Sequence, residues 1–253
     1  DIVELRVREP IDLPFAPKRL LVVPDRRHLA VADAFGDGLA IIDRERSHPV
    51  RVRQVAGHHL DGLATSADGR NLLVTHQVLN GREITNDDPV FWGALLNNVM
   101  QSFAWDELLS ASDSMMLERG VVLPLGEPSH GTGDPGAIWM GREGRAIVCL
   151  SGVDELSVRA NAGQPMTRKA TGRRPVAVVA NEAKNWAVVA NQLDDSLTVV
   201  DLQTLTPRAA PISLGPSPTP TEFDKGERLF FDARLSLDGW FSCHSCHVDG
   251  HSN

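Results

Sequence analysis

A strand–turn–strand pattern recurs along the chain and constrains its fold more than any other sequence feature. Each copy has an apolar strand, a turn with a charged or small polar residue, a second apolar strand and a loop. The four copies run over Arg19–Asp43, Asp61–Gln77, Gly136–Arg159 and Pro175–Leu202. Their spacing is about 40 residues, except for a middle interval of nearly two periods. That interval indicates an irregular repeat or a long insertion.

The strands inside these repeats have the composition of buried strands. Leu20–Val23, Val176–Ala180 and Trp186–Ala190 are continuous apolar runs. Such runs suit strands that are covered on both faces, and units of short strands with this period are typical of a β-propeller. We therefore predict a mainly β chain that folds as a propeller. The residues expected to be buried between strands are Val31, Ile147, Val178 and Val188.

The repeats resemble those of seven-bladed propellers with YVTN or WD40-like sequences. The fourth repeat is the closest, with VVAN at 188–191 and SLTVVD at 196–201. The resemblance covers about residues 19–205 and implies a seven-bladed scaffold, which leaves the function open. Four recognisable repeats are too few to close such a ring. We therefore expect either repeats that the pattern does not reveal or a chain that is a fragment of a longer protein.

Changes in composition divide the chain into three parts. Residues 1–206 hold the repeats, which an insertion at about 80–132 interrupts; we expect it to form a lid with a short helix near Glu107–Ala111. Five prolines between positions 207 and 220 indicate an extended linker. Residues 221–253 have a different character, and Thr221 is a suitable N-cap for a helix over 222–231. We expect this last part to be a short α-helical segment.

The last part contains the run Cys243-His244-Ser245-Cys246-His247, which has the C-x-x-C-H pattern of c-type haem attachment. Two thiols three residues apart on a tight turn can each bond one vinyl group of the same porphyrin. The histidine that follows can then give its imidazole to the iron as an axial ligand. Cys243 and Cys246 are therefore candidate attachment residues, and His247 is the candidate iron ligand.

Other chemistries also use closely spaced cysteines. A zinc site could recruit Cys243, Cys246 and His247 together with His251 or His244, but the adjacent Cys246 and His247 make poor joint ligands. A disulfide between the cysteines leaves His247 unexplained. A thioredoxin-like redox pair would lie beside a βαβ unit, and the sequence has no such pattern. Haem attachment accounts for both cysteines and the histidine.

The flanking sequence from 225 to 250 resembles the first haem-binding segment of the di-haem cytochrome c peroxidase family, which includes oxidases of the methylamine-utilisation type. The matching residues are Gly226, Leu229, Phe230, Asp232, Arg234, Leu235, Ser236, Ser242, Cys243, Cys246 and His247. The resemblance implies covalent haem c and peroxidase or oxidase chemistry in a longer di-haem protein. The second haem and the catalytic residues are then expected outside this chain. The whole chain resembles bacterial proteins that fuse propeller repeats to such a domain.

The same resemblance has implications for partners and location. It implies a small redox protein or another electron donor, peroxide or a similar oxidant, and a periplasmic or exported protein. The net charge of −8 argues against nucleic acid as a partner, and no apolar stretch reaches the ~18 residues that span a bilayer. A non-catalytic binding propeller with a cytochrome tail for electron transfer or docking is the alternative function.

Two further patterns have simple structural interpretations. Gly131, Gly133 and Gly136 fit G-x-G-x-x-G, but no strand precedes them and no helix follows, so they indicate a turn before a repeat rather than a phosphate site. Cys149 lies in an apolar run and is expected to be a small core residue.

Three histidines and two aspartates carry weaker signals. His58, His59 and His130 precede repeats, where they could line a pocket or bind a metal, but their spacing defines no ligand set. We favour solvated or capping roles for all three. Asp87 and Asp88 lie in a polar stretch and are expected to form a turn rather than a catalytic pair.

Overall fold

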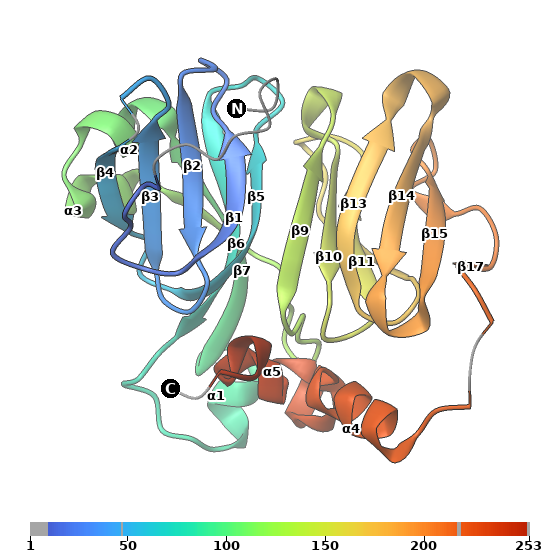
Figure 1. The fold of residues 1–253 in the computed structure, drawn as a ribbon. Coiled ribbons are helices and arrows are strands. Elements are labelled where there is room, and N and C mark those ends of the chain that lie inside the picture. The colour runs from blue at the N-terminus through green and yellow to red at the C-terminus, as the bar shows by residue number, and fades with distance from the viewer. Residues whose placement is uncertain (1–9, 47, 217–218, 252–253) are drawn as a thin grey trace.

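The computed structural model describes residues 10–46, 48–216 and 219–251 and contains four antiparallel sheets that follow one another along the chain (Figure 1). We call these sheets blades 1 to 4. Blade 1 comprises β1 Pro17–Val22, β2 His28–Asp33, β3 Gly38–Asp43 and β4 His48–Gln54. Blade 2 comprises β5 His58–Thr65, β6 Asn71–Leu79, β7 Leu96–Ala104 and β8 Val121–Pro124.

Blades 3 and 4 repeat the same strand order. Blade 3 comprises β9 Pro135–Met140, β10 Ala146–Leu150, β11 Glu155–Arg159 and β12 Thr167–Ala170. Blade 4 comprises β13 Pro175–Asn181, β14 Trp186–Asn191, β15 Ser196–Asp201 and β16 Thr206–Pro207, and β17 Ile212–Ser213 also pairs with β15. The first strands of successive blades pack against one another, β1 on β5, β5 on β9 and β9 on β13. The chain is therefore mainly β and has propeller architecture, as the repeats predict.

Three apolar cores lie between neighbouring blades. Side chains that alternate between the two faces of single strands contribute to these cores. On β6, Leu72 packs into the core between blades 1 and 2, whereas Leu73 packs into the core between blades 2 and 3. On β10, Val148 faces blade 2 and Ile147 faces blade 4. Side chains on a strand alternate between its two faces, so an unbroken apolar run supplies two cores at once. Cys149 is fully buried in the third core, as the sequence predicts.

The burial prediction is confirmed for Val31 and Ile147 and is wrong for Val188. Val31 and Ile147 are nearly inaccessible, and Val178 is partly buried against the core between blades 3 and 4. Val188 is half-buried because it alternates with the buried Ala187 and Val189 and so lies on the opposite face of blade 4.

The interval 80–132 is not wholly an insertion, because it holds two strands of blade 2. Strand β7 pairs with β6 over nine residues, and β8 pairs with β7. The excursions are helix α1 Asp87–Phe91 between β6 and β7, and helices α2 Trp105–Ser110 and α3 Asp113–Arg119 between β7 and β8. Polar residues such as Asn98 and Gln101 interrupt the apolar pattern of β7 and hide it in the sequence. Helix α2 corresponds to the expected short helix, and α3 was not foreseen.

The remaining elements are short. The 3₁₀ helices within the blades are η1 Arg142–Gly144, η2 Glu182–Lys184 and η3 Gln192–Asp194. The C-terminal segment, which we define as residues 221–251, holds α4 Glu222–Phe230, η4 Ala233–Leu235, η5 Leu237–Gly239, α5 Cys243–Cys246 and η6 Val248–Gly250. It runs beneath one end of the blades (Figure 1). No helix among the described residues is long and apolar enough to cross a membrane.

Candidate functional site

The C-terminal segment begins with the helix that the sequence predicts. The Thr221 hydroxyl accepts a hydrogen bond from the Asp224 backbone N–H, and the Asp224 carboxylate accepts one from the Thr221 N–H. This reciprocal capping box satisfies two amide donors at the start of α4 and fixes where the helix begins. Helix α4 ends at Phe230, and the Arg174 guanidinium of blade 4 lies 3.1 Å from the centroid of the next ring, Phe231. That contact places one end of the segment against the propeller.

Two glycines that precede blade 3 form backbone hydrogen bonds with the middle of the C-terminal segment. The Gly131 N–H donates to the Asp238 carbonyl at 2.7 Å, and the Gly133 N–H donates to the Gly239 carbonyl at 3.0 Å. A Cβ atom at Gly131 would lie 2.5 Å from the carbonyl carbon of Gly239, so a side chain there would collide with backbone. The run before β9 is an irregular segment with a bend at Asp134 rather than the predicted turn, and the structure gives the reason for its glycines. They allow two backbones to approach closely.

Trp240 anchors the segment between blades 2 and 3. Its side chain is 2% exposed and packs against Gly126. Its carbonyl accepts a hydrogen bond from the Asn98 side-chain amide at 2.8 Å, and that amide is itself buried on β7. A large buried aromatic ring with a bonded backbone fixes the chain immediately before the cysteine motif.

The cysteine motif has two faces with opposite environments. Ser242, His244 and Ser245 are buried against the propeller. Cys243, Cys246 and His247 are exposed. Cys243 and Cys246 are three residues apart and share one side of the single turn α5, and the exposed His247 follows directly after it.

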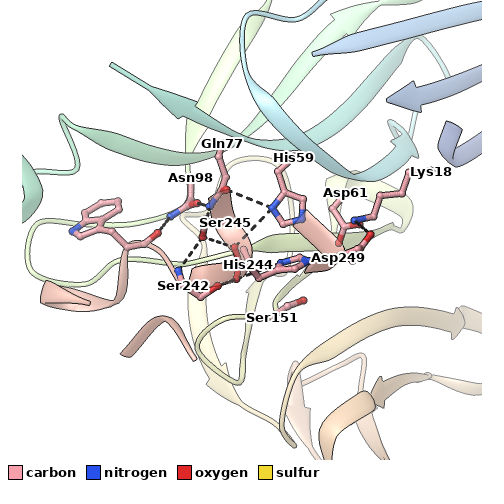
Figure 2. Close-up of polar contacts among 12 residues, drawn as sticks. Lys18, His59, Asp61, Gln77, Asn98, Ser151, Ser242, His244, Ser245 and Asp249 are labelled. Atoms are coloured by element: carbon pink, nitrogen blue, oxygen red, sulfur yellow. Dashed lines mark hydrogen bonds and ion pairs between the residues drawn. The ribbon is translucent and has the colours of Figure 1, made fainter. Parts of the chain in front are cut away.

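Asp134 holds the inner face of the motif. The Ser242 hydroxyl donates to Asp134 Oδ2 at 2.5 Å, and the Ser245 hydroxyl donates to Oδ1 at 2.6 Å. The Gln77 side-chain amide donates to the Ser245 hydroxyl at 3.3 Å and to the side-chain oxygen of Asn98 at 2.8 Å (Figure 2). Asp134 is 3% exposed, at φ 53°, in the left-handed region that aspartate tolerates better than most residues.

Two imidazoles flank the same carboxylate. The Nδ1 atoms of His59 and His244 each lie 3.8 Å from an Asp134 oxygen, and both rings are almost fully buried. The His244 Nε2 atom lies 3.2 Å from the Asp249 carboxylate, which in turn forms an ion pair with Lys18 of blade 1 at 3.1 Å (Figure 2). The motif is therefore tied to blades 1, 2 and 3 through one polar network.

The weaker sequence interpretations have mixed outcomes. The solvated or capping interpretation is wrong for His59, which is buried beside Asp134, whereas His58 is half-buried and His130 is exposed. Asp87 and Asp88 open helix α1 rather than form an isolated turn. Sequence reasoning missed Asp134 as a site residue, although its position between Gly133 and Pro135, in the run that packs on the segment, was a usable signal.

Burial and charge shift several pKa values around the motif. Burial by itself would raise the pKa of Asp134, but contacts with His244, His59 and Ser242 outweigh it and bring the pKa to about 2. Burial lowers the pKa of His59 to about 4. Burial, followed by the charges of Asp134 and Cys243, raises the pKa of the Cys246 thiol. At neutral pH the site therefore combines a buried carboxylate, a neutral His59 imidazole and a protonated Cys246 thiol.

The arrangement suits haem attachment better than a zinc site at the cysteines. His251 stacks on Phe35 with ring centroids 4.3 Å apart. Within the described parts of the chain, the side chains that converge as metal ligands are His59, Asp134 and His244, and Cys243 and Cys246 are not among them. Cys243, Cys246 and His247 instead present one outward face that a flat macrocycle could approach.

Comparison with solved structures supports the fold. The chain aligns with hydrazine synthase of Kuenenia stuttgartiensis at a TM-score of 0.61 and 16% identity, covering 76% of this chain and 60% of that one. It aligns with a functionally unknown protein of Desulfotomaculum acetoxidans at 0.55 and 14%, covering 79% and 57%. The dihydro-haem d1 dehydrogenase NirN aligns at 0.54 and 18%, covering 81% and 38%. At these identities the likeness concerns the fold, and this chain spans less than two thirds of each of these structures.

Sequence comparison provides evidence about the C-terminal segment. The comparison with curated proteins found no match to the chain. One protein-family model matches part of the chain, and the matched part contains α4, Trp240 and both motif cysteines. Residues 220–252 match the family of di-haem cytochrome c peroxidases.

Proposed function

We propose that the chain is a c-type haem protein in which Cys243 and Cys246 hold the porphyrin and His247 is an axial ligand of the iron. The observation that carries this proposal is the division of α5, which buries Ser242, His244 and Ser245 and exposes Cys243, Cys246 and His247. The family match over residues 220–252 supports it.

Attachment of the porphyrin to the two thiols requires no oxidant. Each thiol S–H adds across one vinyl double bond, so that a C–S bond forms and the hydrogen goes to the other vinyl carbon. The raised pKa of Cys246 keeps the thiol proton in place near neutral pH. The backbone bonds at Gly131 and Gly133 and the hydroxyl bonds to Asp134 would hold α5 still while the macrocycle lies on its outer side.

Bound haem supplies one-electron chemistry, and we propose that this chain uses it to transfer electrons. In the longer protein we propose reduction of peroxide or a similar oxidant, with two electrons and two protons converting hydrogen peroxide to two waters. The sequence has a single C-x-x-C-H motif, so the second haem of such a reaction would be outside this chain. A small redox protein would serve as electron donor, and haem attachment would place the protein in the periplasm or outside the cell.

The test is covalent haem on the chain expressed with a periplasmic haem-attachment system. We expect one haem per chain by intact mass and by the pyridine haemochrome spectrum, and loss of both signals in the Cys243→Ala/Cys246→Ala variant. Cys149→Ala is the matched control, because Cys149 is buried in the core between blades 3 and 4 and should leave attachment unchanged. An unshifted mass, or haem that extracts into acidified acetone, would overturn the proposal.

The role of His247 needs its own variant. His247→Ala should retain part of the attachment, because the cysteines are intact, but should change the Soret and charge-transfer bands that report axial ligation. His251→Ala is the control, because His251 stacks on Phe35. An unchanged spectrum in His247→Ala would contradict the assigned ligand.

A further inference from the structure

A second cluster of potential ligands lies on the inner side of α5, away from the cysteines. One ligand atom from each of His59, Asp134 and His244 lies within 4.8 Å of the other two. The two nitrogen–oxygen distances of 3.8 Å are too long for hydrogen bonds. Ligand atoms around a tetrahedral zinc ion are about 3.3 Å apart, from bond lengths near 2.0–2.1 Å. The three atoms therefore surround a space slightly larger than a metal coordination sphere.

The carboxylate of this cluster is buried, because Asp134 is 3% exposed. Across residues 10–46, 48–216 and 219–251, the groups within ion-pair distance of it are His59 and His244, with no lysine or arginine. A buried carboxylate is costly without a cation.

The imidazoles are only partly satisfied by protein groups. The Nε2 atom of His59 is buried without a hydrogen-bond partner among the described residues, and its Nδ1 atom has a long contact of 3.4 Å with the Gln77 carbonyl oxygen. His244 is oriented from behind, because its Nε2 atom contacts Asp249 and leaves Nδ1 facing Asp134. A carboxylate behind an imidazole is the outer arrangement found for metal-binding histidines.

Asp134 is oriented in the same manner. The hydroxyls of Ser242 and Ser245 each occupy one lone pair of its carboxylate oxygens. An ionised carboxylate accepts about four bonds, so a lone pair on each oxygen is left for a further partner. Asp134 and His244 are thus held in place by contacts that would persist with an ion bound.

We propose that His59, Asp134 and His244 bind one divalent transition-metal ion of the zinc class at the junction between the propeller and the C-terminal segment. Two imidazole nitrogens and one carboxylate oxygen suit zinc rather than calcium or magnesium, which prefer all-oxygen sites. His59 comes from blade 2, Asp134 precedes blade 3 and His244 belongs to α5. An ion here would neutralise the buried carboxylate and lock the segment onto two blades.

Zinc binding to the purified full chain with haem attached tests this site. After chelator treatment and removal of the chelator, the chain is equilibrated with Zn²⁺, desalted and measured for zinc per chain by mass spectrometry. We expect about one zinc ion, and at least tenfold weaker Zn²⁺ affinity in His59→Gln and Asp134→Asn. His130→Gln is the matched control, since His130 is exposed, and should bind as the parent does. Less than a tenth of an ion per parent chain would overturn the proposal.

A second measurement covers the case in which Asp134→Asn fails to fold. Zn²⁺ should raise the melting temperature of the parent chain and of His130→Gln, but not that of His59→Gln. An equal increase in His59→Gln would overturn the site even if zinc is bound elsewhere.

The outcome is separable from that of the haem proposal. In Cys243→Ala/Cys246→Ala the inner site should keep its zinc although no haem can attach. Zinc that disappears in this double variant would overturn the inner site. Retained zinc in a chain that never acquires haem would leave this inference standing and reject the haem proposal alone.

Discussion

At the scale of single residues, the site depends on polar side chains buried in blade 2. His76, Gln77, Asn98 and Gln101 are all nearly inaccessible, and each lies on β6 or β7. Each has at least one polar partner within the site or the blade, such as the 2.9 Å contact between His76 Nε2 and Gln101. Buried polar groups are tolerated where they are bonded, and two of these four, Gln77 and Asn98, contact Ser245 and Trp240 of the C-terminal segment.

The titration of His76 gives the first prediction. Burial lowers the pKa of His76 below the usual 6.5, and the hydrogen bond from its ring to the Gln101 side-chain oxygen offsets this only in part. As the pH falls below 6.5, His76 is therefore protonated in the unfolded chain but stays neutral in the folded chain. The free energy of unfolding then falls as the pH falls. His76→Gln should reduce this slope by at most about 1.4 kcal/mol per pH unit, the value for one proton.

Denaturant unfolding between pH 7 and 5, with chelator present, measures that slope. His48→Gln is the control, because His48 is exposed on blade 1 and should leave the slope as in the parent. A slope in His76→Gln equal to the parent slope would contradict the prediction.

At the scale of elements, the sequence predicts what apolar pattern and capping determine. Apolar runs mark strands such as β13 and β14, and Thr221 and Asp224 mark α4, so these elements are evident before the structure. Strand β7 is hidden because Asn98 and Gln101, one on each of its two buried faces, are residues that a hydrophobic pattern counts as exposed.

The site residues likewise fall into those that the sequence predicts and those that it does not. Cys243, Cys246 and His247 form a local motif, and local spacing identifies them. Asp134 contacts Ser245 across 111 positions of chain, and His59 comes from a different blade again. No local pattern encodes such pairs, because folding of the propeller creates them.

The glycines that receive the segment give the second prediction. Gly131→Ala would place a methyl group 2.5 Å from backbone atoms of Gly239 and Trp240, so the segment must shift, at a cost of about 1–3 kcal/mol. Gly226→Ala is the matched control in α4, where a Cβ meets nothing within 4 Å and should stabilise the helix by about 0.5–1 kcal/mol. Thermal unfolding should therefore move in opposite directions in the two variants. An unchanged melting temperature in Gly131→Ala would show that the close approach is not maintained in solution.

At the scale of the whole molecule, the C-terminal segment connects all four blades. Phe231 lies under Arg174 beside blade 4, and Ser242 reaches Asp134 before blade 3. Further along, Trp240 and Ser245 contact blade 2, and Asp249 pairs with Lys18 of blade 1. A segment with bonds to every blade should not detach while the blades stay folded, so its unfolding should be coupled to theirs.

This coupling gives the last prediction, which Ser245→Ala tests. In the parent chain with haem attached, the Soret band and the far-ultraviolet circular dichroism should change at one temperature, because the segment and the blades unfold together. Ser245→Ala removes the hydrogen bond that the hydroxyl donates to the buried Asp134 and the bonds that it accepts from the Gln77 side chain and the Ser242 N–H, at a cost of about 1–3 kcal/mol at the junction. The Soret midpoint should then fall below the circular dichroism midpoint by roughly 2–4 °C or more, as expected for a chain of this size. Ser110→Ala is the control, because its hydroxyl bonds within an exposed turn of α2 and should leave the two midpoints together. Two separate transitions in the parent chain would show that the segment is docked too weakly for the coupling argued here.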